Sequence, residues 1–145
     1  MAELLLLVQL ATTLFMVGLI WFVQVVHYPL FDRVGRSGFQ AYSEAHSRLT
    51  TRVVGPPMLL EAFTAGALIF IRPAAVPAFL VWVGAGLLAL VWLSTIYLQV
   101  PHHSRLGLGF DANAHGGLVL SNWVRTVAWS GRALVVLWMA ALAMP

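Results

Sequence analysis

Long runs of apolar residues alternate with short polar stretches along the chain, and four such runs are present. The first run is long enough to cross a bilayer core of about 30 Å as an α-helix that rises about 1.5 Å per residue. The pattern therefore predicts an all-α fold, an integral membrane four-helix bundle that forms a single transmembrane domain over residues 1–145. The predicted membrane helices cover about residues 4–27, 57–72, 76–100 and 118–144.

The polar stretch between the first two runs predicts an additional helix over about residues 38–53. Tyr42 and His46 lie one turn apart on one face of it, and charged or hydroxyl side chains occupy the other face. This amphipathic pattern is typical of a helix that lies at the membrane surface or folds back over a bundle. The Gly-Pro-Pro sequence at 55–57 is expected to end it and to begin the next membrane helix.

The composition also favours a membrane protein. Hydrophobic residues make up 61% of the chain and charged residues 9%, whereas a soluble domain carries about 25% charged residues. The absence of cysteine excludes disulfides, thiolate nucleophiles and thiolate metal ligands. The net charge of +3 comes from arginines that lie mostly in the polar stretches. We therefore attribute it to membrane orientation, expect membrane lipid as the surrounding, and predict no nucleic-acid partner.

The same arginines predict the orientation of the helices. Four crossings place the first and third polar stretches on one side of the membrane and the second stretch, with Arg72, on the other. The arginines of the first side are Arg33, Arg36, Arg48, Arg52 and Arg105. Because cytoplasmic loops are enriched in basic residues, the first and third stretches are expected in the cytoplasm and both termini outside.

Polar side chains gather at the helix ends on the predicted cytoplasmic side, while the opposite ends are almost purely apolar. These residues are Gln24, His27, Glu61, Gln99, His102, Asn122 and Arg125, joined by Tyr42 and His46 from the amphipathic helix. A charge near the bilayer centre costs at least about 2.5–3.5 kcal/mol, so Glu61, Arg125 and Arg132 need partners. The arrangement predicts one shared site near the cytoplasmic leaflet.

One interpretation of this cluster is a metal site whose nitrogen and oxygen ligands suit iron, copper, zinc or manganese. The predicted ligands are His27, His46, Glu61 and His102. Gln24, Gln99 and Asn122 would orient the imidazoles through hydrogen bonds. The ligands come from four different segments, so no HExxH or ExxH spacing is present.

Two other interpretations use overlapping residues. In the first, Trp92, Tyr97, Trp123 and Trp129 line a flat pocket for haem or another organic cofactor. Arg125 and Arg132 would then hold its carboxylates or phosphates. In the second, the polar groups are structural, with Glu61 and Arg125 as an intramembrane ion pair and the histidines as hydrogen-bonded side chains.

Short sequence strings carry a family resemblance. They are QxxHYPxF at 24–31, Phe39…His46, Pro57-Met58…Glu61, QVPH at 99–102 and NWxRTxxWxxR at 122–132. Together they resemble a widespread, functionally obscure group of small four-helix bacterial membrane proteins. This resemblance implies the inner membrane of a bacterium as the location and implies no particular activity.

The chain is also similar in size and layout to the bacterial four-helix protoporphyrinogen oxidase, which binds haem. The shared features are Gly18 and Trp21 in the first helix, Arg52 followed by Pro57-Met58, and Asn122 followed by Thr126. This similarity implies haem as an alternative cofactor. The histidine that this family carries early in its first helix has no counterpart here, where residues 10–14 read LATTL.

The leading hypothesis is a membrane-embedded, metal-dependent oxidoreductase that acts on a lipophilic substrate or a quinone-like carrier entering between helices. Redox chemistry is favoured because no hydrolytic nucleophile arrangement is visible. The predicted catalytic residues are Tyr42 and Arg125, and the predicted cofactor-binding residues are Gln24, Gln99, Asn122, Trp123, Trp129 and Arg132. The alternatives are a protein that binds or transports an anionic or protonatable small molecule, working as a homo-oligomer, and an accessory subunit of a larger membrane complex.

Overall fold

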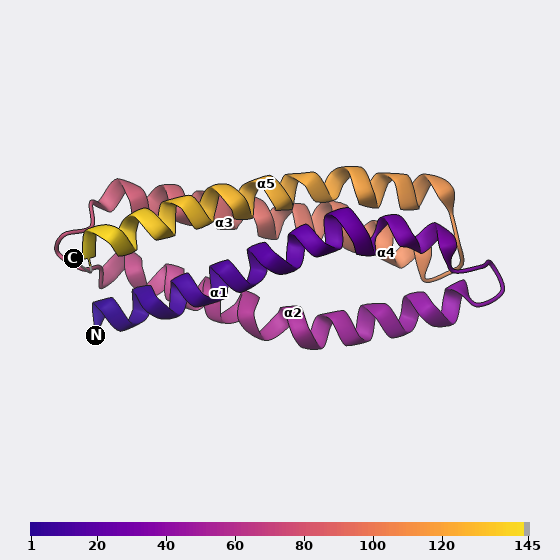
Figure 1. Ribbon diagram of the computed structural model, residues 1–145, viewed down its shortest axis with the longest axis horizontal. Coiled ribbons are helices and arrows are strands. Elements are labelled where there is room, and N and C mark those ends of the chain that lie inside the picture. The colour runs from indigo at the N-terminus through magenta and orange to yellow at the C-terminus, as the bar shows by residue number, and fades with distance from the viewer. Residues whose placement is uncertain (144–145) are drawn as a thin grey trace.

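The computed structural model describes residues 1–143, and most of them are helical (Figure 1). The elements are α1 (Ala2–Phe22), the π-helical turn η1 (Val23–His27), the 3-10 turn η2 (Pro29–Arg33), α2 (Phe39–Phe70), α3 (Ala78–Ser94), the π-helical turn η3 (Thr95–Gln99), α4 (Val100–Leu106) and α5 (Ala112–Ala143). Residues 1–143 contain no strand. The prediction of an all-α fold is confirmed.

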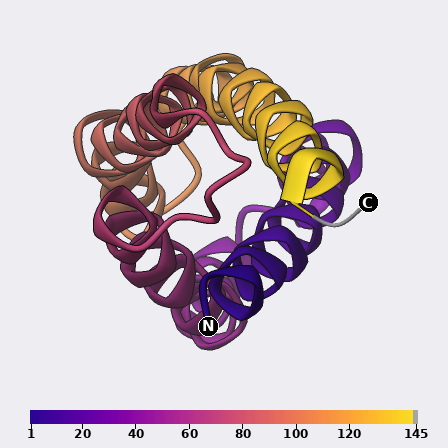
Figure 2. The same cartoon turned by 90° about the vertical axis from the view of Figure 1, so that its left-hand side faces the viewer.

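The helices form four rods. The rods are arranged in a ring, as the view along the bundle shows (Figure 2). Going round the ring, α1 packs against α2, α2 against α3, α3 against α5, and α5 against α1. α4 continues the rod that α3 begins (Figure 1). One end of the bundle holds the N-terminus, the end of α5 and the connection 71–77; the other end holds the connections 34–38 and 107–111 (Figure 1).

Each rod is long and apolar enough to cross a membrane. The four stretches are Ala2–Arg33, Phe39–Phe70, Ala78–Leu106 and Ala112–Ala143. Two clusters of buried apolar side chains hold the rods together, one around Phe31 and Trp129 and the other around Leu6 and Val136. Polar side chains are also buried inside the bundle, among them Glu61 and Arg132.

The predicted separate helix over 38–53 is not seen, because α2 is a single helix from Phe39 to Phe70. Pro56 and Pro57 lie inside it and do not end it. Each proline lacks the N–H for one helical hydrogen bond and crowds the carbonyl four residues earlier, which bends a helix. The two halves of α2 accordingly differ in direction (Figure 1).

Two other boundaries differ from the sequence prediction. The third rod continues past residue 100 through Pro101 to Leu106, since proline is tolerated in the first turn of α4. The fourth helix begins at Ala112, because the Asp111 carboxylate accepts a hydrogen bond from the Ala114 N–H at 2.6 Å and so caps the helix. Met144, the predicted last residue of that helix, lies outside the described residues.

Candidate functional site

Glu61 is completely buried at the middle of the bundle, and three donors satisfy its carboxylate. Oε1 accepts hydrogen bonds from Thr13 Oγ1 and from Arg132 Nε, both at 2.7 Å. Oε2 accepts from Trp129 Nε1 at 3.1 Å. The ion-pair partner of Glu61 is therefore Arg132, whereas the structural interpretation of the sequence had paired it with Arg125.

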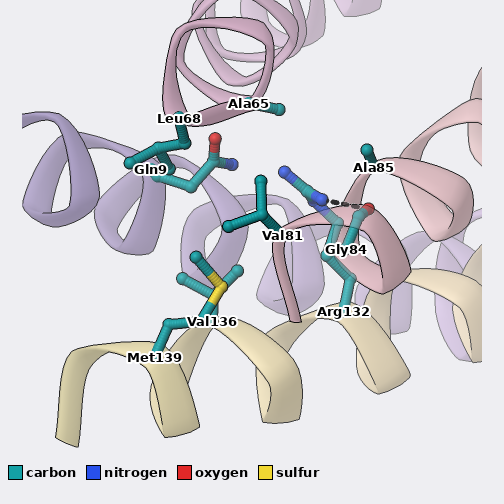
Figure 3. A pocket seen from close by; sticks show the side chains of 9 residues that line it. All are labelled: Gln9, Ala65, Leu68, Val81, Gly84, Ala85, Arg132, Val136 and Met139. Atoms are coloured by element: carbon teal, nitrogen blue, oxygen red, sulfur yellow. Dashed lines mark hydrogen bonds between the residues drawn. The ribbon is translucent and has the colours of Figure 1, made fainter. Parts of the chain in front are cut away.

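The polar network continues from Glu61 toward the end with the termini. Thr64 Oγ1 donates to Gln9 Oε1 at 2.8 Å, and Arg132 Nη1 donates to the Gly84 carbonyl. Gln9 and Arg132 face each other across a small void of about 10 Å³ (Figure 3). A void of this size has room for about one water molecule. We therefore regard this part of the network as structural.

The histidines form a second, separate group near the other end. His27 Nε2 lies 2.8 Å from His46 Nδ1, and the His46 ring stacks on the His103 ring with centroids 5.3 Å apart. His103 Nε2 lies 2.9 Å from the Tyr28 hydroxyl. The η1 turn with Tyr28 directly after it, the first half of α2, and α4 thus bring three imidazoles and one phenol together.

Of the two adjacent histidines in α4, His103 joins this group and the predicted ligand His102 does not. His102 packs against Gly117 of α5, where an added Cβ would collide with its imidazole. Neighbouring residues of a helix point about 100° apart, so only one of the pair can face inward. Because the third rod continues as a helix past Pro101, Gln99 and His103 lie four residues apart on one helical face. This i, i+4 spacing is the sequence signal that would have identified His103 as the inward-facing histidine.

The four predicted metal ligands do not form one site. Glu61 is paired with Arg132, His102 faces Gly117, and only His27 and His46 are in contact. Because α2 is continuous, Glu61 lies 15 positions beyond His46, about 22 Å along the helix. Within residues 1–143, no group of three or more His, Cys, Asp or Glu side chains is placed to hold a metal ion.

Arg125 is positioned by amide side chains. Asn122 Oδ1 accepts from Arg125 Nη2 at 2.6 Å and from Nε at 2.9 Å. Asn122 Nδ2 in turn donates to Gln24 Oε1 at 2.9 Å. The remaining donors reach Thr95 Oγ1 at 3.4 Å and the Tyr28 hydroxyl at 3.5 Å. Gln24 and Asn122, predicted to orient imidazoles, orient this guanidinium.

The charge of Arg125 has no acidic partner among residues 1–143. Its side chain is only 7% exposed, and its hydrogen-bond acceptors are a neutral amide and two hydroxyls. The guanidinium also lies 5.9 Å from the Trp129 ring. Burying a charge without a counter-charge is costly. An anionic group placed beside Arg125 would remove this cost.

A cavity of about 560 Å³ lies between α1, α2, the α3–α4 rod and α5, and Arg125 forms part of its wall. Its other polar lining residues include Tyr28, His46, Thr95, Gln99 and His103. Its apolar lining residues include Met16, Ile20, Met58, Leu59, Trp92 and Trp129. The volume lies within the range of about 300–1,000 Å³ that is typical of small-molecule sites.

The remaining predicted site residues are divided between the cavity and other surroundings. Gln99 and Trp129 line the cavity. Trp123 is 42% exposed and packs edge-on against Trp21, so it does not line a cofactor pocket. Tyr42 is not part of the cavity wall, and its ring stacks against the His46 ring with centroids 6.4 Å apart.

The chain matches no protein-family model, no curated protein and no solved structure in comparisons with all three.

Proposed function

We propose that this protein is integral to a membrane and binds a lipophilic small molecule with an anionic head group in the cavity beside Arg125. Large apolar side chains such as Phe63, Phe70 and Trp82 are more than half exposed on the outer faces of the rods. Exposed apolar surface costs about 25 cal/mol per Å² in water, and lipid removes that cost. The distribution of arginines favours an orientation with the connections 34–38 and 107–111 in the cytoplasm.

The unbalanced charge of Arg125 is the observation that carries the proposal. Planar guanidinium groups bind carboxylates and phosphates through paired hydrogen bonds. The Asn122 amide holds the guanidinium in place, and the apolar cavity wall provides the surface for a hydrocarbon portion. An acid with a long apolar tail fits both features.

Binding of cis-parinarate, a fluorescent long-chain carboxylate, to the purified protein in detergent tests this proposal. Trp92 and Trp129 line the cavity and can transfer excitation energy to the bound probe. We expect saturable binding that excess palmitate displaces. Arg125→Gln should lower the affinity about 10- to 100-fold, since hydrogen bonds to charged groups contribute about 1.5–3 kcal/mol.

Arg105→Gln is the matched control, because Arg105 is exposed on α4 outside the cavity wall. Its affinity for cis-parinarate should equal that of the unmodified protein. Equal affinities in the unmodified protein and in Arg125→Gln would refute the role of Arg125, and binding without saturation would refute the site.

Gly55→Leu tests the location of the site. Gly55 lines the cavity, and a Cβ added there meets no atom within 4 Å, so a larger side chain has open space to enter the cavity at this position. We expect Gly55→Leu to abolish saturable binding. Gly66→Leu, on the same helix and equally free of contacts but outside the cavity wall, should bind the probe normally.

A second candidate function is an oxidoreductase for a quinone-like carrier, favoured by the Tyr28–His103 pair at the cavity wall. Quinone reduction consumes protons, and a hydroxyl and an imidazole in hydrogen-bond contact can supply them. The two electrons would come from an external reductant, and a bound metal or haem would relay them to the quinone. An absorption spectrum and elemental analysis of the purified protein test this function. A haem band or a stoichiometric metal that His103→Ala removes would support it, and a featureless spectrum without metal would contradict it.

A further inference from the structure

The polarity of the cavity wall changes along the bundle. Tyr28, His46 and His103 lie at the end near the connections 34–38 and 107–111, whereas Met16 and Leu59 lie toward the middle of the bundle. On α2 alone the lining extends from His46 to Leu59, about 20 Å at 1.5 Å per residue. A bilayer leaflet has the same order, with polar head groups outside and hydrocarbon inside.

The polar end of the cavity is closed toward water. Phe31, Phe39 and Leu106 are each at most 1% exposed at this end of the bundle. The Phe31 ring packs edge-on against the His46 ring at 5.0 Å, and the Phe39 ring packs edge-on against Phe110 at 5.1 Å. A water-soluble ligand would have to displace this aromatic layer to reach Arg125.

The side of the cavity is open between α2 and α4. Thr51 and Leu59 on α2 and Val100 and Ser104 on α4 line the cavity and are exposed on the outside of the bundle. The lining residues on the α1 and α5 side, such as Met16, are buried or only partly exposed. The opening therefore lies on one lateral face, between two of the rods that are apolar enough to cross a membrane.

The surface of this opening suits lipid. Leu59 is 64% exposed and Val100 is 52% exposed. The Thr51 hydroxyl donates to the Ser47 carbonyl at 2.7 Å, and the Ser104 hydroxyl donates to the Val100 carbonyl at 3.0 Å. Both hydroxyls are therefore satisfied within their own helices, as groups in contact with hydrocarbon must be.

From these observations we infer that the ligand is a bilayer amphiphile with one anionic head, and that it enters laterally from the membrane through the opening between α2 and α4. Its head reaches Arg125 at the polar end, and its tail lies toward the middle of the bundle. This inference rests on the proposed function, to which it adds the source and route of the ligand. A carboxylate and a phosphate head share the chemistry that the guanidinium recognises.

The chain has no cysteine, so a single introduced thiol can carry a bulky maleimide at a chosen position. We would label Thr51→Cys and Ser104→Cys at the opening, Glu44→Cys on the part of α2 outside the cavity wall, and Ser37→Cys at the closed end. The rate of cis-parinarate association would be measured by rapid mixing with the reconstituted protein, with palmitate, lysophosphatidate and butyrate as competitors.

We expect labels at positions 51 and 104 to slow association about tenfold or more, and labels at positions 37 and 44 to leave it unchanged. Palmitate or lysophosphatidate should compete, and butyrate should not. Slowing by the label at position 37 alone, or competition by butyrate equal to that by palmitate, would overturn lateral access while leaving the Arg125 site intact. Absence of saturable binding in the unlabelled protein would refute the proposed function itself.

Discussion

Arg125 and Arg132 are both buried on α5, yet their charges are balanced in different ways. Arg132 donates to the Glu61 carboxylate, so its charge is balanced within the protein. Arg125 donates to Asn122 and to hydroxyl groups, which carry no charge. This difference assigns Arg132 to the stability of the bundle and leaves Arg125 as the cation that a ligand can reach.

Glu61→Gln is expected to destabilise the protein strongly. The substitution removes the counter-charge of Arg132 at a position that is completely buried. Breaking a buried ion pair in this way costs about 3–5 kcal/mol. Reversible unfolding of the purified protein, followed by circular dichroism as a denaturing detergent is added, would measure the change in the free energy of unfolding.

Glu44→Gln provides the comparison for this measurement. Glu44 is exposed and accepts a single hydrogen bond, from Gln40 at 3.3 Å. The free energy of unfolding should then change by no more than about 0.5 kcal/mol. Similar values for the two substitutions would show that the Glu61–Arg132 pair makes no net contribution to stability.

At the scale of single elements, α2 and the two π-helical turns position the site. The first half of α2 carries His46 to the cavity, and the second half carries Glu61 to the middle of the bundle. A π-helical turn contains an extra residue, which changes the faces of the side chains around it. Gln24 in η1 and Gln99 in η3 are both buried as a result of this change of face. Each makes a hydrogen bond to a residue of α5.

The packing of α4 against α5 depends on a glycine. A Cβ at Gly117 would collide with the His102 imidazole, whereas a Cβ at Gly116 meets no atom within 4 Å. Alanine in place of glycine inside a helix normally stabilises by about 1 kcal/mol. We expect this gain for Gly116→Ala, and a loss of stability for Gly117→Ala because His102 must move. Thermal unfolding of the two variants side by side would measure the difference, and equal midpoints would argue against close α4–α5 packing at this position.

At the scale of the whole molecule, the bundle is asymmetric along its axis. The end with the connections 34–38 and 107–111 holds the histidines and the polar part of the cavity, and the other end holds an apolar cluster around Leu6 and Val136. Most arginines outside the core also lie toward the end with the connections 34–38 and 107–111. The site is therefore expected in the cytoplasmic half of the membrane.

Labelling of intact bacterial cells that express the protein tests this orientation. Ala75→Cys lies in the connection 71–77, and Ser37→Cys lies in the connection 34–38; both positions are exposed. A maleimide that cannot cross membranes should react with the thiol at position 75 in intact cells and with the thiol at position 37 only after lysis. The reverse pattern would place both termini in the cytoplasm.

Several features could be predicted from the sequence because they depend on short-range patterns. The apolar runs predict four helical rods, and the polar residues at their ends predict that Gln24, Asn122 and Arg125 meet. The pairing of side chains that are far apart in the sequence could not be predicted. Arg125 and Arg132 are seven residues apart, two turns on the same face of α5, so the sequence offers Glu61 two equivalent arginines.

The sequence by itself determined that the chain is helical, that its rods are apolar enough for a membrane, and that buried charges require partners. These properties follow from the hydrophobicity and backbone preference of each residue, which act locally. Only the tertiary structure decided that Glu61 pairs with Arg132, that His103 faces inward in place of His102, and that a cavity opens beside Arg125. Each of these depends on the bend and rotation of whole helices, which the packing of all four rods sets together.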